Sequence, residues 1–499
     1  MTAKATGTSP NPPVRADGPA PPPPYPRRWL AVAVLLAAFM VDLVSVTIVN
    51  VALPTMGRAL DAGPAELEWI SAGYLLAFAV SLITAARLGD QIGRKRVFLA
   101  SVALFALASL ACAVAPGTGT LIGARIVQGI AAAGIAPQVL STVYTIFDAR
   151  ERAAVFGVLG IVSGLSQALG LLLGGVLVSA DLAGLGWRSI FVVLVPVAVA
   201  IAALGAAWVP ETRAPGAARP KPLAALVLTV GLVAIIAPLL EGTRLGWPWW
   251  TWPCMAGGVA AVVLLALAEH GRGRPERTGE SAAPSSSALL PLDLLRVRTV
   301  GAALVIQLVA FGAFSGLLLV LALWMQDGLG FSPLLAGLVT VAIPIGSLPI
   351  APFMGRLTLR LGRLTVGLGC LVIAAGVAAL IPAALGTPDV SAWAILPGLA
   401  LIGAGVNLTM PALTTLYMAE VPAHHAASAS GIITTGQQFA GGLGVALLAA
   451  TFFGQLGGGD YRSAITASAT VAAVVVALCA PLCLAMSKPK LGAPAGSAA

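Results

Sequence analysis

Long apolar runs follow one another along almost the whole of this 499-residue chain, and only 9% of its residues are charged. A helix needs about 20 apolar residues to cross the hydrocarbon core of a bilayer. Fourteen runs reach or approach that length: 29–54, 67–86, 97–116, 119–146, 153–180, 189–209, 222–240, 252–268, 298–325, 332–354, 364–384, 392–418, 428–455 and 463–486. We therefore predict an all-α polytopic membrane protein, in which helices satisfy their own backbone polar groups within lipid.

The net charge of +9 raises the question of an acidic partner such as nucleic acid. If the odd-numbered gaps between runs lie on one side of the membrane, that side carries few cations. They are Arg58, Arg188, Arg244 and Arg462, whereas the even-numbered gaps and both tails hold nearly all the others. Cytoplasmic loops carry the excess of Lys and Arg in membrane proteins. The charge therefore predicts two cytoplasmic termini and does not indicate nucleic-acid binding.

A weak internal sequence repeat divides the runs into two halves. Arg87-Leu-Gly-Asp-Gln-Ile-Gly-Arg94 follows the second run, and Gly355-Arg-Leu-Thr-Leu-Arg-Leu-Gly-Arg363 follows the tenth. Aligning the two segments pairs runs one to six with runs nine to fourteen and leaves runs seven and eight as an insertion. The predicted organisation is a disordered cytoplasmic tail (1–28), a first six-helix half (29–210), an inserted helix pair (211–268), a Ser-rich cytoplasmic linker (269–297), a second six-helix half (298–486) and a second cytoplasmic tail (487–499).

The loop between runs two and three is short and strongly polar. An acid, a glycine turn and three consecutive cations cannot lie in hydrocarbon, so the loop must lie at the cytoplasmic surface. Its key residues are Leu88, Gly89, Asp90, Gly93, Arg94 and Lys95. Simple anchoring by positive charge would require neither the acid nor the paired glycines.

That loop resembles the cytoplasmic loop after the second helix of major facilitator superfamily transporters, with Ala86 in place of the pattern's first glycine. Other segments resemble the fourteen-span drug:proton antiporter group of that superfamily. They are Thr47-Ile-Val-Asn-Val-Ala-Leu-Pro54, Trp69 with Tyr74, Arg125-Ile-Val-Gln-Gly129, Trp187-Arg-Ser-Ile-Phe191 and Gln437-Gln-Phe-Ala-Gly-Gly442. The resemblance implies two six-helix halves plus two inserted central helices, with the substrate site between the halves. It also implies that the loop acts as a conformational latch, in which Asp90 meets a helix of the other half.

Asp42 in the first run and Arg125 in the fourth are the ionisable residues that we place at membrane depth. A charged side chain there costs at least roughly 2.5–3.5 kcal/mol, which makes each a functional candidate. We predict that Asp42 carries a coupled proton, and the resemblance implies that Arg125 takes part; a permanent structural ion pair is the alternative. The two residues differ in depth by roughly 9 Å, so direct pairing would need a stretched arginine or a water. The related transporters often place their acid one turn later, at the position of Ser45.

Small and polar residues within the runs give further candidates. Glycines at spacings of three and four in the fifth run predict close helix packing; they are Gly160, Gly164, Gly170, Gly174 and Gly175. The related antiporters have a proline where this chain has Leu171, so the built-in bend is missing. Polar residues either line the translocation path or bond to neighbouring helices, and both roles stay open for Ser45, Asn50, Gln128, Gln307, Asn407 and Gln437.

The sequence contains no Walker lysine loop, no Ser/His/Asp arrangement and no metal-ligand cluster, which argues against an enzyme, a cofactor and ATP as the energy source. We predict no disulfide among the five cysteines, which lie in or beside apolar runs. The leading hypothesis is a monomeric, proton-driven exporter of small organic compounds in a bacterial cell membrane, conferring resistance to an antibiotic or drug. An uptake symporter for a small metabolite and a non-transporting membrane receptor are the alternatives.

Overall fold

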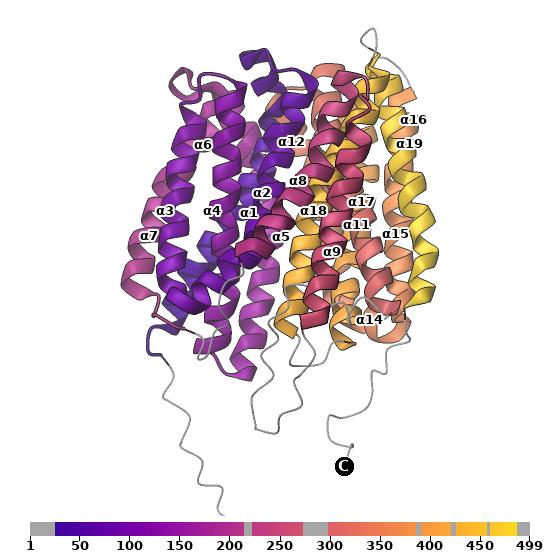
Figure 1. Cartoon of the computed structure of the whole chain (residues 1–499). Coiled ribbons are helices and arrows are strands. Elements are labelled where there is room, and N and C mark those ends of the chain that lie inside the picture. The colour runs from indigo at the N-terminus through magenta and orange to yellow at the C-terminus, as the bar shows by residue number, and fades with distance from the viewer. Residues whose placement is uncertain are drawn as a thin grey trace, which may run out of the picture.

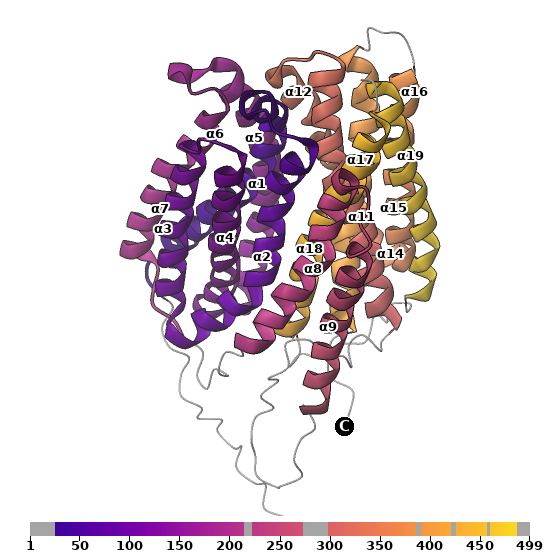
Figure 2. The same cartoon turned by 45° about the horizontal axis from the view of Figure 1, so that its top comes forward.

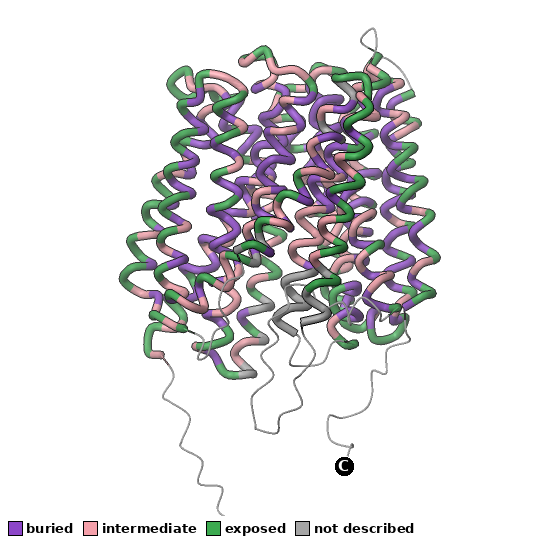
Figure 3. The backbone as a smooth tube through the Cα atoms, viewed as in Figure 1, coloured by how far each residue is buried: buried purple, intermediate pink, exposed green. Residues whose placement is uncertain are grey.

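A computed structural model describes residues 25–213, 222–272, 298–385, 391–420, 426–456 and 460–486. The described residues form helices and no strands, and the long helices stand side by side in one bundle (Figures 1 and 2). Buried residues concentrate in the middle of this bundle and exposed residues on its outer surface (Figure 3). The predicted second tail, and nearly all of the first tail and the linker, lie outside the described residues.

The first five runs each form one long helix in the predicted order, and the sixth is divided into a short and a longer helix. Gly63-Pro64 stands at the junction of the first and second helices and Gly93 at that of the second and third. The elements are α1 (Arg28–Leu60), α2 (Pro64–Ile92), α3 (Arg94–Ala113), α4 (Thr118–Ile146), α5 (Ala149–Ala180), two short turns η1 (Leu182–Gly184) and η2 (Gly186–Arg188), α6 (Ser189–Val192) and α7 (Leu194–Trp208).

The second half contains more interrupted helices. The tenth run carries Pro344, Pro349 and Pro352, which cannot donate a helical hydrogen bond, and it is divided into four pieces. The elements are α11 (Arg298–Leu323), the π-helical turn η3 (Trp324–Gly328), α12 (Pro333–Thr340), α13 (Ala342–Ser347), η4 (Ala351–Phe353), α14 (Met354–Leu361), α15 (Arg363–Ala378), α16 (Leu380–Leu385), α17 (Ala392–Ala419), α18 (Ala426–Gln455), α19 (Tyr461–Cys479) and η6 (Ala480–Ala485).

Twelve helical stretches among the described residues are long and apolar enough to cross a membrane. The two remaining runs form α8 (Pro222–Leu245) and α9 (Thr251–Arg272). Their apolar parts are shorter, Leu226–Pro238 and Thr251–Leu265. The count of fourteen spans therefore stays a prediction.

The helices pack in two equivalent sets. In the first half α1 packs on α5 and α3 on α4; in the second half α11 packs on α18 and α15 on α17. Two seams join the halves, α2 against α18 and α5 against α12, and the equivalent helices exchange places between them. Gly93 and Gly362 also begin α3 and α15 with positive φ angles of 118° and 54°. This arrangement is a pseudo-two-fold repeat. The helices α8 and α9 pack on each other, and α8 contacts both α2 and α18.

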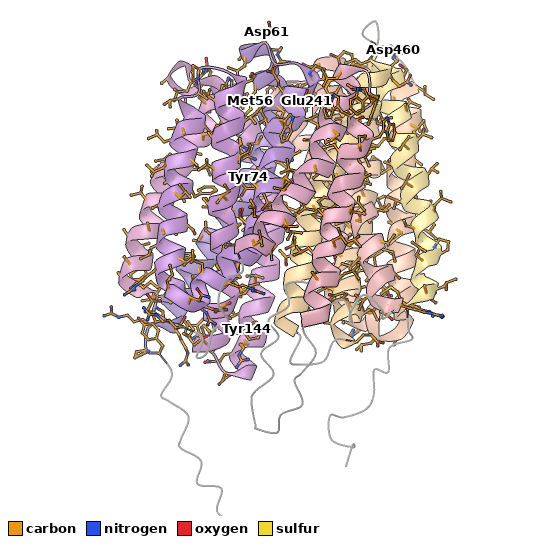
Figure 4. The ribbon with its side chains drawn as sticks, viewed as in Figure 1. Met56, Asp61, Tyr74, Tyr144, Glu241 and Asp460 are labelled. Atoms are coloured by element: carbon orange, nitrogen blue, oxygen red, sulfur yellow. The ribbon has the colours of Figure 1, made fainter. Side chains whose placement is uncertain are left out.

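Charge and topology distinguish the two ends of the bundle. We call the end that carries Arg94, Lys95 and Arg363 the basic end. The opposite, far end carries Asp61 and Asp460, whereas Tyr144 lies toward the basic end (Figure 4).

Contacts between the halves close the bundle at the far end. Arg58 of α1 forms an ion pair with Asp327 of η3. The Gln326 side chain donates from Nε2 to the backbone oxygen of Val51 at 2.7 Å. A Cβ added to Gly175 of α5 would lie only 2.8 Å from the backbone oxygen of Pro333, so this glycine allows α5 and α12 to touch.

The halves separate along α5 toward the basic end. Gly164 and Gly160 continue the helix face that includes Leu171 and Gly175, but both are exposed. Beyond the neighbouring backbone of α5 itself, no described atom lies within 4 Å of a Cβ built on either one. The prediction that these two glycines pack against another helix is therefore wrong for the described structure, in which no neighbouring helix reaches them. The structure is closed at the far end and open along α5 at the basic end.

Candidate functional site

A buried hydrogen bond joins α1 to α2 in the middle of the first half. Asp42 is 3% exposed and Tyr74 is fully buried. The Tyr74 hydroxyl donates to Asp42 Oδ1 at 2.5 Å. One turn beyond Asp42, the Ser45 hydroxyl donates to the Tyr74 oxygen at 3.4 Å. The carboxyl group is thus held by a phenol rather than by a cation.

Arg125 of α4 lies over the other part of the same tyrosine. Its guanidinium carbon is 4.2 Å from the centre of the Tyr74 ring, within the range of a cation–π interaction. It donates from Nε to the backbone oxygen of Ile70 at 3.2 Å and from Nη1 to Gln128 Oε1 at 2.5 Å. Gln128 in turn donates to the Ser109 hydroxyl at 2.8 Å. Arg125 therefore has partners of its own, apart from the acid.

This geometry bears on the alternative of a direct ion pair between Asp42 and Arg125. Neither a stretched arginine nor a water is needed, since the Tyr74 ring stands between the two groups and contacts both. Tyr74 belongs to the site, although the sequence indicated only that it resembles, with Trp69, a residue of the transporter group. The signal that could have found it is a tyrosine in the middle of an apolar run, because a buried phenol usually needs a hydrogen-bond partner. Arg125 thus keeps its partners Ile70, Gln128 and the Tyr74 ring without a direct bond to Asp42.

Close glycine contacts set the position of α1 beside this site. A Cβ on Gly170 would lie 3.0 Å from the backbone oxygen of Val44, and one on Gly174 would lie 2.9 Å from that of Ile48. These two glycines let α5 approach the backbone of α1. Gly170, Gly174 and Gly175 thus form close helix contacts, in contrast to Gly160 and Gly164.

Most of the predicted cavity residues bond to neighbouring helices instead. Ser45, Gln128 and Gln307 are at most 4% exposed, and Gln307 donates to the backbone oxygen of Ile433 at 2.6 Å. Asn50 is 7% exposed and accepts from the Ser71 hydroxyl at 3.5 Å. Within a bilayer, a hydrogen bond to a neighbouring helix stabilises a polar side chain more than apolar surroundings do. Asn407 and Gln437 are half-buried and are the two that remain open to a role in the translocation path.

The loop at the basic end is held within the first half. Arg94 Nη2 lies 2.8 Å from Asp90 Oδ1, and Arg94 Nη1 donates to the Ser141 backbone oxygen at 3.0 Å. Lys95 donates from Nζ to the Ala206 backbone oxygen at 2.7 Å. Gly89 faces the side chain of Gln138, which leaves no space for a Cβ. Leu88 is exposed at the protein surface.

The predicted contact of Asp90 with the second half is not among the described interactions. Residues 421–425 and the side chains of 426–432, which begin α18 at the basic end of the second half, lie outside the described residues, so the latch stays a prediction.

A second buried acid was missed in the sequence. Glu68 of α2 is 3% exposed, although it stands near the start of its run, where a carboxyl group is expected to reach the membrane surface. Among the described residues no group of three or more metal-ligating side chains occurs, and the five cysteines are free.

Comparison with known families decides what this bundle is. The profile described as Major Facilitator Superfamily matches residues 34–221 and 212–445. The chain belongs to the major facilitator superfamily. It is therefore a multi-pass membrane transporter, and the resemblance of its loops and helices to this family is confirmed.

Relatives and solved structures agree with that assignment. A probable actinorhodin transporter of Streptomyces coelicolor is 37% identical over 453 residues, which covers 88% of this chain and 76% of the relative. The puromycin resistance protein of Streptomyces alboniger is 35% identical, covering 85% and 82%. A peptide transporter solved in complex with sulfate superposes with a TM-score of 0.64 over 91% of this chain and 95% of its own, at 17% identity. This last similarity shows the fold alone.

Proposed function

We propose that this transporter exports small organic compounds of the antibiotic class in exchange for protons. The observation that carries the proposal is the Asp42–Tyr74–Arg125 arrangement, a protonatable carboxyl group buried in a half that contacts its counterpart at the far end. Relatives named for actinorhodin transport and puromycin resistance support the direction and the class of substrate. The proton gradient supplies the energy, without a bound cofactor.

The geometry suggests how proton binding changes the packing of α1 and α2. When Asp42 is ionised, it accepts the Tyr74 hydrogen bond and ties the two helices together. When Asp42 is protonated, it no longer requires that donor, and Tyr74 can bond to Ser45 instead, which already lies within 3.4 Å. Because Arg125 stays over the Tyr74 ring, movement of the tyrosine reaches α4 as well. Alternating access then follows from the two halves rocking about the site.

We further propose that the basic end faces the cytoplasm of a bacterial cell and that the monomer is the transporting unit. On a background without the native cysteines, Leu182→Cys at the far end should react with a membrane-impermeant thiol reagent added to intact cells. Leu359→Cys on α14 at the basic end should react only after the cells are opened. Both side chains are exposed, at 52% and 62%. Labelling in the reverse order would place the termini outside.

Export is tested with puromycin and a fluorescent organic cation as probes. Cells that express the protein should survive higher puromycin concentrations and extrude the dye, and a protonophore should abolish both effects. Greater sensitivity to the drug, with gradient-driven accumulation of the probe, would favour the uptake symporter. A protonophore-insensitive protection would rule out the proposed energy source.

A further inference from the structure

A second buried carboxyl group lies in α2 between Tyr74 and the far end. Glu68 stands six residues before Tyr74, a separation of roughly 9 Å along the helix axis. The residue is 3% exposed, and its Oε2 atom has no hydrogen-bond partner. The mechanism proposed for Asp42 makes no use of it.

The inserted helix α8 places another acid beside Glu68. Glu241 is close enough for the two carboxyl groups to repel each other when both are ionised. The indole of Trp69, the residue after Glu68, donates to Glu241 Oε1 at 3.2 Å. Figure 4 shows Glu241 toward the far end of the bundle. Glu241 therefore has a hydrogen-bond donor, whereas Glu68 has none at Oε2.

Among the described side chains, the cations on the neighbouring helices have other partners, and the Arg244 side chain of α8 lies outside the described ones. Arg58 of α1 pairs with Asp327, and Arg125 of α4 binds the Ile70 backbone oxygen and the Tyr74 ring. The helix α18 contains no ionisable residue, and the cations of α3 lie at the basic end.

The other nearby acids are also engaged. Asp42 of α1 accepts from Tyr74, and Glu66 accepts from the backbone N–H of Gly63 and from the Thr118 hydroxyl. Among the side chains that the structure describes, none offers Glu68 a positive charge.

An isolated carboxylate in these surroundings is costly, and such a group normally takes up a proton instead. Two carboxyl groups that share one site likewise hold one proton between them. We propose that Glu68 is a second proton-binding group of this transporter, loaded from the far end, and that its proton keeps α8 docked against α2. Loss of the proton would leave two like charges facing each other across this contact. Because α8 also packs on α18 of the second half, repulsion between Glu68 and Glu241 would weaken the contact between α2 and α18 that joins the halves.

The first test measures melting temperature against pH for the purified full-length protein in detergent, without substrate. Glu68 is protonated when folded and ionised above about pH 4.3 when unfolded, so folding takes up a proton. The contribution of Glu68 to stability is then present at low pH and declines as pH rises toward the value at which the folded protein releases the proton. Glu68→Gln cannot lose a proton, so its melting temperature should rise relative to wild type between about pH 5 and pH 9.

Glu66→Gln is the matched control. It makes the same chemical change two residues away, at a carboxyl group with two hydrogen-bond donors, and its difference from wild type should not vary with pH over that range. Parallel curves for Glu68→Gln and wild type would overturn the proposal.

The second test uses dicyclohexylcarbodiimide, which reacts with protonated carboxyl groups in apolar surroundings. Mass spectrometry should find an adduct on Glu68 at pH 5 that declines as pH rises. In Glu241→Gln the decline should begin at lower pH, because the neighbouring charge no longer favours the proton. A Glu68 adduct that is absent at pH 5, or a decline that Glu241→Gln leaves unchanged, contradicts the proposal. Neither test depends on the proposed export activity.

Discussion

Asp42→Asn is expected to reduce gradient-driven export to the level of cells without the transporter, while the protein still folds and reaches the membrane. The amide can accept the Tyr74 hydrogen bond, so the packing of α1 on α2 is kept, but it cannot carry a proton. Exchange of substrate down its own gradient should persist, since that reaction needs no proton. Export of a fluorescent substrate and exchange of a labelled one, measured in the same vesicles, separate the two effects.

Two further variants make this expectation specific. Asp61→Asn removes an exposed acid at the far end, outside the buried site, and should export normally. Tyr74→Phe keeps the ring beneath Arg125 but removes the donor to Asp42, a hydrogen bond to a charged group worth about 1.5–3 kcal/mol. Because that bond favours the ionised acid, Tyr74→Phe should export poorly at acidic pH and recover at alkaline pH. Full export by Asp42→Asn would remove the basis of the proposed coupling.

Gly164→Trp is expected to leave the protein folded in the present state and to disfavour its conversion to the opposite state. Beyond the neighbouring backbone of α5 itself, no described atom lies within 4 Å of a Cβ at this position, so the open basic end can accommodate the indole. Closure of that end would bring the second half onto the α5 face that includes Gly164. Overpacking costs roughly 1–3 kcal/mol, which would make the closed form about 5- to 150-fold rarer. The rate of export should fall by a similar factor.

Gly174→Trp, ten residues further along the same helix, is the matched control. Its Cβ would lie 2.9 Å from the Ile48 backbone oxygen and 3.1 Å from Val51 Cβ, so the variant should fail to fold. Size-exclusion chromatography of both purified variants gives the amount of folded protein. Wild-type export by Gly164→Trp, or misfolding equal to that of Gly174→Trp, would contradict the open basic end.

The helical architecture could be predicted because the apolar runs are long and because glycine, proline and charge mark their ends. The burial of Asp42 and Arg125 could be predicted for the same reason, since both stand well inside such runs. The position of Tyr74 between these two residues could not be predicted, because the depth of two residues in separate helices does not show which side chain lies between them. Tyr74 became part of the site only once α2 was placed between α1 and α4.

Other predictions from the sequence were wrong or incomplete for the same reason, because they depend on how the helices pack. Glu68 stands close enough to the end of its run to be read as a surface residue, but it is buried in a helix that packs on α4, α8 and α18. The spacing of Gly160 and Gly164 correctly identifies a face of α5 but does not tell in which conformation that face is covered. Polarity alone likewise could not separate Gln128, which bonds to Arg125 and Ser109, from half-buried Gln437.

Proton movement that depends on substrate tests the central claim most directly. Inverted vesicles with an acidic lumen and an enclosed pH-sensitive dye would be exposed to puromycin, and the wild-type protein should make the lumen more alkaline as the drug enters. Asp42→Asn should produce no such change, whereas Asp61→Asn should match the wild type. Wild-type proton release from vesicles bearing Asp42→Asn would show that the coupled proton is carried elsewhere.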